Sequence, residues 1–324
     1  MPRLSTSLIL ALLFALVGCG GRSVQTAPTT APAAESAPSE RSHRTLACAA
    51  TEGLRVGLPR PFLYEVRHGQ NTSLLFGTIH AGVAAQRALG DRCLEAVKRA
   101  RILLTELPLE VDQRLIVSAM MLPEGQSLRA LVGDARFEQI AARIDGAPPE
   151  LLDRFAPWAA VVAASVEEMK QIAAARGGDR DAVMDQEIQT LATRFGVPND
   201  GLETPEAQLA LFTEAPLAAL LRMADRSFSE QGYAEGVELF EAYLAGDEGA
   251  LHEMSDMDYL EDIAPEFLEA ILPARNRAWM PRLTDELQKG GVFVAVGAGH
   301  LFGEDGLLEL LAKAGFEIRR LTFD

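Results

Sequence analysis

Two apolar segments that each end in the pattern Gly-x-x-His constrain the fold of this chain more than any other feature. The first covers residues 74–80 (LLFGTIH) and the second covers residues 292–300 (VFVAVGAGH). A short apolar run that meets a glycine and precedes a helical pattern is typical of a buried strand leading into a loop. In open α/β sheets, functional groups gather where such strands end. The sequence therefore predicts that His80 and His300 lie at two strand ends and share one site.

The segments that follow the two motifs are also alike. A helical pattern over residues 89–100 and an apolar segment over residues 101–106 follow His80. A helical pattern over residues 305–314 and a strand pattern over residues 316–323 follow the second motif. The sequence pattern of each half therefore predicts the order strand, Gly-x-x-His, helix, strand. Because a helical crossover returns the chain in the same direction, the strands of the first half should be parallel.

The region between the halves, from about residue 109 to about residue 290, has a mostly helical pattern. Residues 149–175 and 216–245 repeat apolar side chains near the 3.6-residue period of a helix. Residues 197–202 contain Pro198 and can form only a short edge strand. We therefore expect an α/β fold in which duplicated strand-helix-strand halves form a mixed central sheet, with a large helical insertion between them.

Two glutamates and one arginine are candidates to join the histidines. Glu106 ends the second strand of the first half, so its side chain should reach the same sheet edge as His80. Glu203 is either a further acid at this edge or a helix-start carboxylate stabilised by the helix dipole, and the sequence favours neither. Arg275, in a helical stretch, could orient Glu106 or Glu203, bind a substrate carboxylate or carbonyl, or form a surface ion pair.

These residues together resemble the TraB/GumN family, which includes the Tiki proteins. The family pattern is two Gly-x-x-His motifs, a glutamate after the first and an arginine before the second. The matching positions are Gly77 to His80, Glu106, Arg275, and Gly297 to His300. Further similarity occurs in residues 122–128, 157–158 and 201–208 and at Asp185, and the resemblance extends from about Pro61 to the C-terminus.

The candidate residues include the donor types of a catalytic metal site. Such sites commonly take three protein ligands, often two histidines and one glutamate, and leave a position for water. We therefore predict His80, Glu106 and His300 as ligands of a divalent metal or as direct catalysts. Glu203 would act as a proton shuttle and Arg275 as electrostatic support.

The resemblance to the Tiki proteins implies a metal-dependent peptidase, with manganese or cobalt favoured over zinc. Glycines beside both histidines would let backbone or substrate approach closely. We predict substrate contacts at four positions: Gly77, Thr78, Gly297 and Gly299. The partner would then be a peptide or protein substrate in the bacterial envelope.

Two other functions fit the same residues. Without metal, the histidines and glutamates could act as a general base and its partner, in a hydrolase similar to the distantly related erythromycin-esterase-like enzymes. Alternatively, the pheromone-shutdown name of the TraB branch suggests a protein that binds a peptide without cleaving it. Metal content distinguishes the metal-dependent peptidase from the metal-free hydrolase. Cleavage of any peptide distinguishes both hydrolases from a protein that only binds peptides.

The N-terminus resembles a bacterial lipoprotein signal. Arg3 and the apolar residues 8–17 are typical of a signal peptide over residues 1–18, too short to be a stable membrane anchor. Residues 16–19 (LVGC) resemble a lipobox, which favours lipidation of Cys19 over an ordinary secretory signal. Gly20 rather than aspartate favours the outer membrane, facing the periplasm.

A tether is expected to separate the lipid anchor from the folded domain. Residues 19–47 are rich in alanine, proline, serine and threonine and cannot bury enough apolar surface to fold, which leaves residues 48–324 as the domain. With 48% hydrophobic residues, the domain can bury a sizeable core.

Two cysteines and the net charge complete the sequence-based predictions. Cys48 and Cys93 are an even pair that permits a disulfide in an oxidising compartment, although two separate thiols also fit the sequence. The formal charge of −16 and the pI near 4.8 disfavour nucleic acid and anionic membrane surfaces as electrostatic partners.

Overall fold

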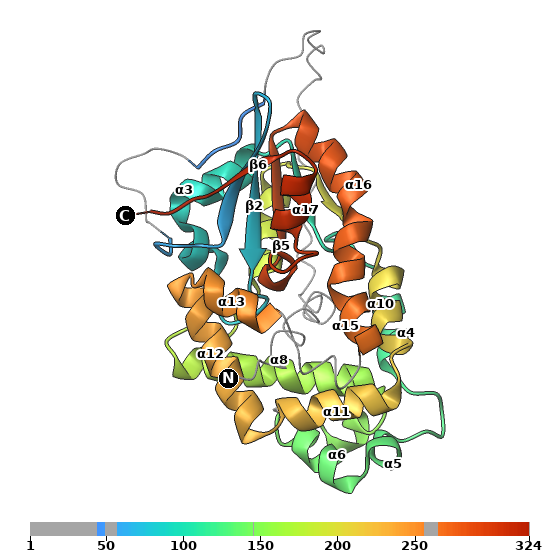
Figure 1. Ribbon diagram of the computed structural model, residues 1–324. Coiled ribbons are helices and arrows are strands. Elements are labelled where there is room, and N and C mark those ends of the chain that lie inside the picture. Colours follow the sequence, from blue (N-terminus) through green and yellow to red (C-terminus); the bar gives the residue numbers. More distant parts are fainter. Residues whose placement is uncertain (1–43, 49–56, 145, 256–264, 324) are drawn as a thin grey trace.

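The computed structural model describes residues 44–48, 57–144, 146–255 and 265–323, and its centre is one six-stranded sheet (Figure 1). The strand order is β4-β3-β5-β2-β1-β6. The first four of these strands are consecutive and parallel, whereas β1 pairs antiparallel with both β2 and β6. The strands are β1 (Leu63–His68), β2 (Asn71–Thr78), β3 (Ile102–Thr105), β4 (Asn199–Gly201), β5 (Val292–Gly297) and β6 (Glu317–Arg320). The predicted α/β fold with a mixed central sheet is confirmed.

Burial along the strands explains their order. All six residues of β5 (VFVAVG) are buried, as expected for a central parallel strand covered on both faces. In β6 (EIRR), exposed residues alternate with partly buried ones, which suits the charged edge of a sheet. The apolar runs thus form the middle of the sheet and the charged strand closes one side.

The two predicted halves are present, but they interleave. The first is β2, α3 (Ala85–Arg99) and β3, and the second is β5, α17 (Leu307–Lys313) and β6. We expected the strands of one half to share an edge of the sheet, and β2 and β3 do run parallel. However, β5 lies between them and pairs with both. A strand of the second half therefore lies between the two strands of the first half. This arrangement places the two Gly-x-x-His motifs at the ends of the neighbouring strands β2 and β5.

The insertion is helical, as predicted, and it includes the edge strand β4. Each of the two long helical patterns divides into two helices; for example, the second is interrupted at Phe228 and restarts at the N-cap Ser229. The helices are α4 (Gln113–Met120), α5 (Leu128–Val132), α6 (Asp134–Ala141), α7 (Pro149–Leu152), α8 (Pro157–Ala175), α9 (Met184–Arg194), α10 (Pro205–Thr213), α11 (Leu217–Ser227), α12 (Glu230–Ala245), α13 (Glu248–Ser255), α15 (Pro265–Ile271) and α16 (Pro273–Lys289).

The insertion packs around the carboxyl edge of the parallel strands. Helix α16 contacts β1 and β2, whereas α9 contacts β3, β4 and α3. Figure 1 shows the arrowhead of β2 directed toward the layer formed by α8, α11 and α12. Side chains that leave the strand ends therefore enter a space that the insertion surrounds.

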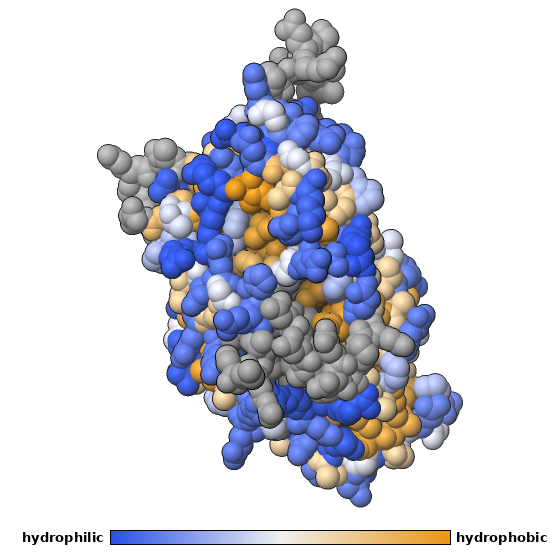
Figure 2. Space-filling view, viewed as in Figure 1, coloured by the Kyte–Doolittle hydropathy of each residue, from blue (hydrophilic) through white to orange (hydrophobic). Residues whose placement is uncertain are grey.

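The outer surface is largely hydrophilic on the face drawn in Figure 2, and apolar side chains gather at its lower right, over α11 and the neighbouring short helices. Leu217, in the first turn of α11, is one of the exposed large hydrophobic residues. Within the described ranges, no helix is both long and apolar enough to cross a membrane.

The start of the folded domain differs from the prediction. Thr45 forms a parallel bridge with Thr72 of β2, and Leu46 is buried in the core, although both were assigned to the tether. A disulfide joins Cys48 to Cys93 of α3. The domain therefore includes residues from at least Arg44 rather than from residue 48. The predicted signal peptide (1–18), Cys19 and most of the tether lie outside the described residues.

Candidate functional site at the carboxyl edge of the sheet

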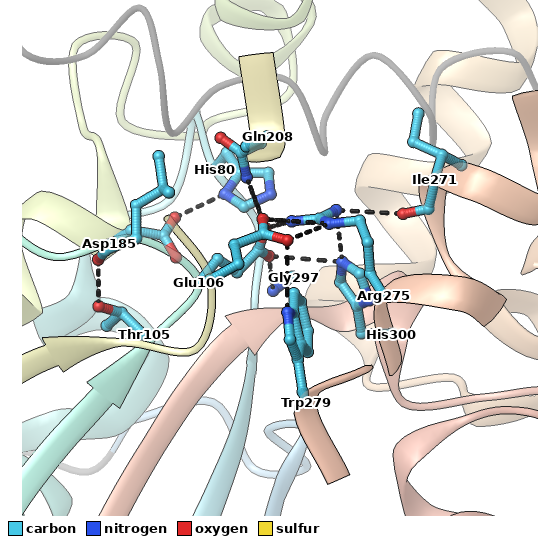
Figure 3. Close-up of polar contacts among 12 residues, drawn as sticks. His80, Thr105, Glu106, Asp185, Gln208, Ile271, Arg275, Trp279, Gly297 and His300 are labelled. Atoms are coloured by element: carbon cyan, nitrogen blue, oxygen red, sulfur yellow. Dashed lines mark hydrogen bonds and ion pairs between the residues drawn. The ribbon is translucent and has the colours of Figure 1, made fainter. Parts of the chain in front are cut away.

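Four adjacent parallel strands each deliver one candidate residue to the same edge. Glu203 follows β4, Glu106 follows β3, His300 follows β5 in a 3-10 turn (Ala298–His300), and His80 follows β2. Strands β3 and β4 end together, because Thr105 pairs with Gly201, and β2 and β5 end together, because Thr78 pairs with Gly297. The second pair extends two residues beyond Ala295, the partner of Thr105. The shared site predicted from the two motifs is thus a row of side chains across four strand ends, and Figure 3 shows the convergence of His80, Glu106 and His300.

Arg275 of α16 lies at the centre of this row. Its side chain is only 6% exposed, so it does not form a surface ion pair. Nη2 donates to Glu106 Oε2 at 2.6 Å and to Glu203 Oε1 at 2.5 Å, and Nε donates to both oxygens of Glu203 at 3.0–3.1 Å. Nη1 donates to the carbonyl oxygen of Ile271 and to Nε2 of His300, each at 3.1 Å. All five guanidinium N–H groups therefore have acceptors, which gives Arg275 an orienting function.

Glu106 is held from two sides. Oε1 accepts from the backbone N–H of Gly297 at 2.8 Å, while Oε2 accepts from Arg275. Oε1 also lies 3.7 Å from Nε2 of His300. The carboxylate is 2% exposed, so burial would be costly without these charge-assisted contacts.

His300 is fixed as a neutral imidazole. Because a guanidinium has only donors, Nε2 of His300 must accept from Arg275, and the proton must lie on Nδ1. Nδ1 then donates to Oδ1 of Asn276 at 2.6 Å. Burial, the charge of Arg275 and the charge of His80 together lower the pKa of His300 well below 6.5. The ring of Trp279 packs 4.4 Å from the imidazole, centroid to centroid.

His80 is held by a different partner, and its pKa is shifted in the opposite direction. Nδ1 lies 2.7 Å from Oδ2 of Asp185, whose other oxygen accepts from the hydroxyl of Thr78 at 2.8 Å. Burial lowers the pKa of His80, but the charge and hydrogen bond of Asp185, with a further contribution from Glu106, outweigh it and raise the pKa. In the described part of the chain, Nε2 of His80 is buried and has no hydrogen-bond partner.

The loops around His80 and Asp185 are fastened to each other. Gly82 and Asp179 form an antiparallel bridge, and the Asp179 carboxylate accepts from the N–H of Ala84 at 3.1 Å. Gly82 has φ +86°, and a Cβ there would lie 2.4 Å from the Cβ of Ala173. Only glycine suits this close approach, so the backbone fixes the distance between the loop that follows His80 and the segment that leads to Asp185.

The four predicted substrate contacts stay predictions, and three of the residues also have contacts within the protein. A Cβ on Gly77 would lie 2.6 Å from Cδ1 of Leu301, so glycine permits close packing at this position. Thr78 donates to Asp185 and the N–H of Gly297 donates to Glu106. Gly299 is buried in the 3-10 turn, and its substrate contact stays a prediction.

The three predicted metal ligands do not fit a metal ion as they are placed. Both oxygens of Glu106 and Nε2 of His300 accept hydrogen bonds from Arg275 or Gly297, so only His80 of the three offers an uncommitted donor atom. A catalytic site commonly needs three ligand atoms directed at one point. Among the residues described, no group of three or more His, Cys, Asp or Glu side chains is placed to hold an ion. The divalent metal stays a prediction, and we derive no step through it.

Three residues of the site were not among the predicted site residues, although Asp185 and the segment that contains Gln208 were noted as positions of family similarity. Asp185, Gln208 and Asn276 contact His80, the two glutamates and His300, respectively. All three lie on helices of the insertion, where the rule that strand ends carry function does not apply. The need for a partner on Nδ1 of each buried histidine is the physical signal that could have indicated a short acid or amide nearby.

Comparison with known proteins gives one family and one relative. The TraB/PrgY/gumN family matches residues 62–320, a range that contains both histidines, both glutamates and Arg275. The chain is also 23% identical over 245 residues to a Shigella flexneri protein named "Uncharacterized protein YbaP", which covers 75% of this chain and 89% of YbaP. No solved structure matches.

The opposite pKa shifts of the two histidines predict different protonation states near neutral pH. His80 should remain an imidazolium as the pH rises above 6.5, because its folded pKa is raised. His300 should remain neutral, with its proton on Nδ1, as the pH falls below 6.5. Imidazole ¹⁵N shifts recorded between pH 5 and 8 measure both states. Titration of His80 and His300 with the same midpoint would contradict the assignment.

Proposed function

This chain belongs to the TraB/PrgY/gumN family, and we propose that it is a hydrolase in which His80 transfers the proton during cleavage of a peptide or protein substrate. One observation carries the proposal. Nε2 of His80 is buried and unpartnered among the described residues, while Asp185 holds the opposite ring nitrogen. An imidazole that is fixed on one side and free on the other is suited to general acid–base catalysis.

The surrounding charges determine what His80 can do. Asp185 stabilises the imidazolium, so His80 can keep a proton at neutral pH and give it to a leaving nitrogen. Asp185 itself has a lowered pKa, because its contacts with His80 and Thr78 outweigh the raising effect of burial. The carboxylate therefore stays ionised while His80 changes protonation state. Water is the nucleophile in this proposal: its oxygen adds to the substrate carbonyl, and the C–N bond breaks as His80 protonates the leaving nitrogen. The proton that the added water loses returns to Nε2 of His80, so the hydrolysis balances without metal.

The other four candidates are held in place by contacts with one another. They are Glu106, Glu203, Arg275 and His300. Arg275 binds both glutamates and His300, so its single positive charge partly compensates the two carboxylates before substrate arrives. Glu106 is tied to the backbone beside His300 through Gly297. These contacts support a positioning function for Arg275, Glu106 and His300. The predicted proton-shuttle function of Glu203 would require its carboxylate to leave Arg275.

Metal-dependent hydrolysis is the second candidate function. The same unpartnered Nε2 favours it, since this atom is an available ligand close enough to Glu106 for that charge to affect its pKa. For Glu106 and His300 to join His80 on one ion, Arg275 would have to release both. The two mechanisms therefore differ in the position of one guanidinium.

We also propose that the protein works in the bacterial envelope, attached through a lipid on Cys19 and facing the periplasm from the outer membrane. The signal pattern of residues 1–18 supports export. The disulfide between Cys48 and Cys93 agrees with an oxidising compartment.

Loss of the Asp185 charge should impair catalysis more than folding. We expect His80→Ala and Asp185→Asn each to lower kcat on the order of 10²–10⁴-fold, because proton transfer loses its group or its orienting carboxylate. The substrates are a set of synthetic peptides, with products identified by mass spectrometry. Asp179→Asn is the matched control, since it changes an exposed acid of the preceding loop and retains an acceptor for Ala84. Equal losses in Asp179→Asn and Asp185→Asn, or wild-type binding of peptides without products, would argue against the hydrolase.

Metal content separates the two candidate mechanisms. Purified without a metal-binding tag and incubated with manganese, cobalt or zinc, the soluble domain should hold well below one tightly bound ion per chain, because Arg275 occupies the donors of Glu106 and His300. Elemental analysis measures the content of wild type, His80→Ala, His300→Ala and the exposed control His68→Ala. About one ion per chain that is lost only in the two site variants would establish the metal-dependent candidate instead.

The lipid anchor is tested by cell fractionation. We expect the wild-type protein in the membrane fraction and Cys19→Ala in the soluble periplasmic fraction, because the thiol that carries the lipid is gone. Thiol labelling of Cys48 and Cys93 provides the internal control, since both proteins should be fully disulfide-bonded if both are exported. Equal membrane retention of the two proteins contradicts the anchor.

A further inference from the structure

Two buried polar atoms at the site lack hydrogen-bond partners within the described part of the chain. They are Nε2 of His80 and Oε1 of Gln208, and the two side chains are only 2% and 1% exposed. Both side chains lie on the same side of Glu106 in Figure 3. Glu106 also links them physically, since it accepts from Gln208 and its charge contributes to the raised pKa of His80.

The orientation of the Gln208 amide is fixed by its neighbours. Nε2 donates to Oε1 of Glu203 at 2.9 Å and lies 3.4 Å from Oε2 of Glu106. Ionised carboxylates only accept hydrogen bonds, so the NH₂ group must face them and the carbonyl oxygen must face away. A flip of the amide would place Oε1 against two carboxylates. The unpartnered atom is therefore an acceptor by necessity.

The N–H groups of Arg275 are not available to this acceptor. All five of its N–H groups are used by Glu106, Glu203, His300 and the carbonyl of Ile271. A buried acceptor without a hydrogen-bond partner is unfavourable, and a bound ligand can supply the missing donor. The missing partner must be a donor, and nearby carboxylates disfavour a ligand group that presents oxygen there.

We propose that Oε1 of Gln208 accepts the N–H of a secondary amide whose scissile bond lies beside Nε2 of His80. This inference rests on the proposed hydrolase and specifies its substrate class. An ordinary peptide bond has the required N–H, whereas an ester and the bond before a proline lack it. The site therefore selects peptide bonds through Gln208 and rejects esters and X–Pro bonds, since these leave the buried oxygen unpaired.

Small amides test this recognition without any need for cleavage. N-methylacetamide has the N–H, and N,N-dimethylacetamide carries a methyl group in its place. We expect the wild-type domain to bind the first on the order of 10-fold more tightly than the second, as judged by NMR titration. In Gln208→Met, which keeps the length of the side chain but removes the acceptor, the ratio should fall to about one.

Gln189→Met is the matched control. Gln189 is also buried, but its amide donates to Thr105 and to the carbonyl of Leu107, and its variant should keep the wild-type preference. A direct readout in the wild type guards against misfolding of the Gln208 variant: the ¹³Cδ shift of Gln208 should move with N-methylacetamide and not with N,N-dimethylacetamide. An unchanged preference in folded Gln208→Met, or an unmoved ¹³Cδ shift, overturns the inference.

The two proposals fail separately. Amide discrimination without cleavage of any peptide would retain Gln208 as a recognition residue and remove the hydrolase. Peptide cleavage with equal kcat/KM for a peptide and for its ester analogue, in both wild type and Gln208→Met, would retain the hydrolase and overturn the recognition.

Discussion

The buried guanidinium of Arg275 is the interaction on which the rest of the site depends. Its five N–H groups bind two carboxylates, one imidazole and one backbone carbonyl. Burial of Glu106 and Glu203 side by side would be strongly unfavourable without this charge, and burial of the guanidinium would be unfavourable without them. Because Arg275 belongs to α16 and both acids follow strands, the cluster also requires the insertion to dock on the sheet edge. The charges of the two acids are therefore compensated only when α16 is docked on the sheet edge.

The same constraint makes two identical motifs chemically different. His80 and His300 both end a Gly-x-x-His pattern on neighbouring parallel strands. His300 lies against Arg275, which needs an acceptor and lowers the pKa of the imidazole, whereas His80 lies against Asp185, which raises it. Neither difference is encoded in the motif itself. The side chains that the insertion places beside each ring make Nε2 of His300 a fixed acceptor and leave Nε2 of His80 without a partner among the described residues.

The parts of the site that follow the strands could be predicted from the sequence, because strand periodicity and parallel crossovers fix where a strand ends. This argument placed His80, Glu106 and His300 together, and it included Glu203 as one of two alternatives. It could not place Asp185, Gln208 or Asn276, because a polar residue on a helix has no sequence rule that identifies the strand end it will reach. The interleaving of the halves was also missed. In the structure, β2 and β5, which are buried along almost their whole length, pair with each other at the centre of the sheet.

The residues of this site come from two parts of the structure, the sheet and the helical insertion. The sheet supplies the residues whose spacing is fixed by hydrogen-bond register, and their positions change little unless the fold changes. The insertion supplies Asp185, Arg275 and Gln208, which set the charge of His80, the charge of the acids and the polarity presented to a ligand. Substitution on the helices can therefore alter protonation and, under the recognition proposed for Gln208, substrate choice while the strand ends stay in place. On this argument, a chain that keeps both Gly-x-x-His motifs but changes these three helical residues retains the fold and loses the chemistry proposed for it.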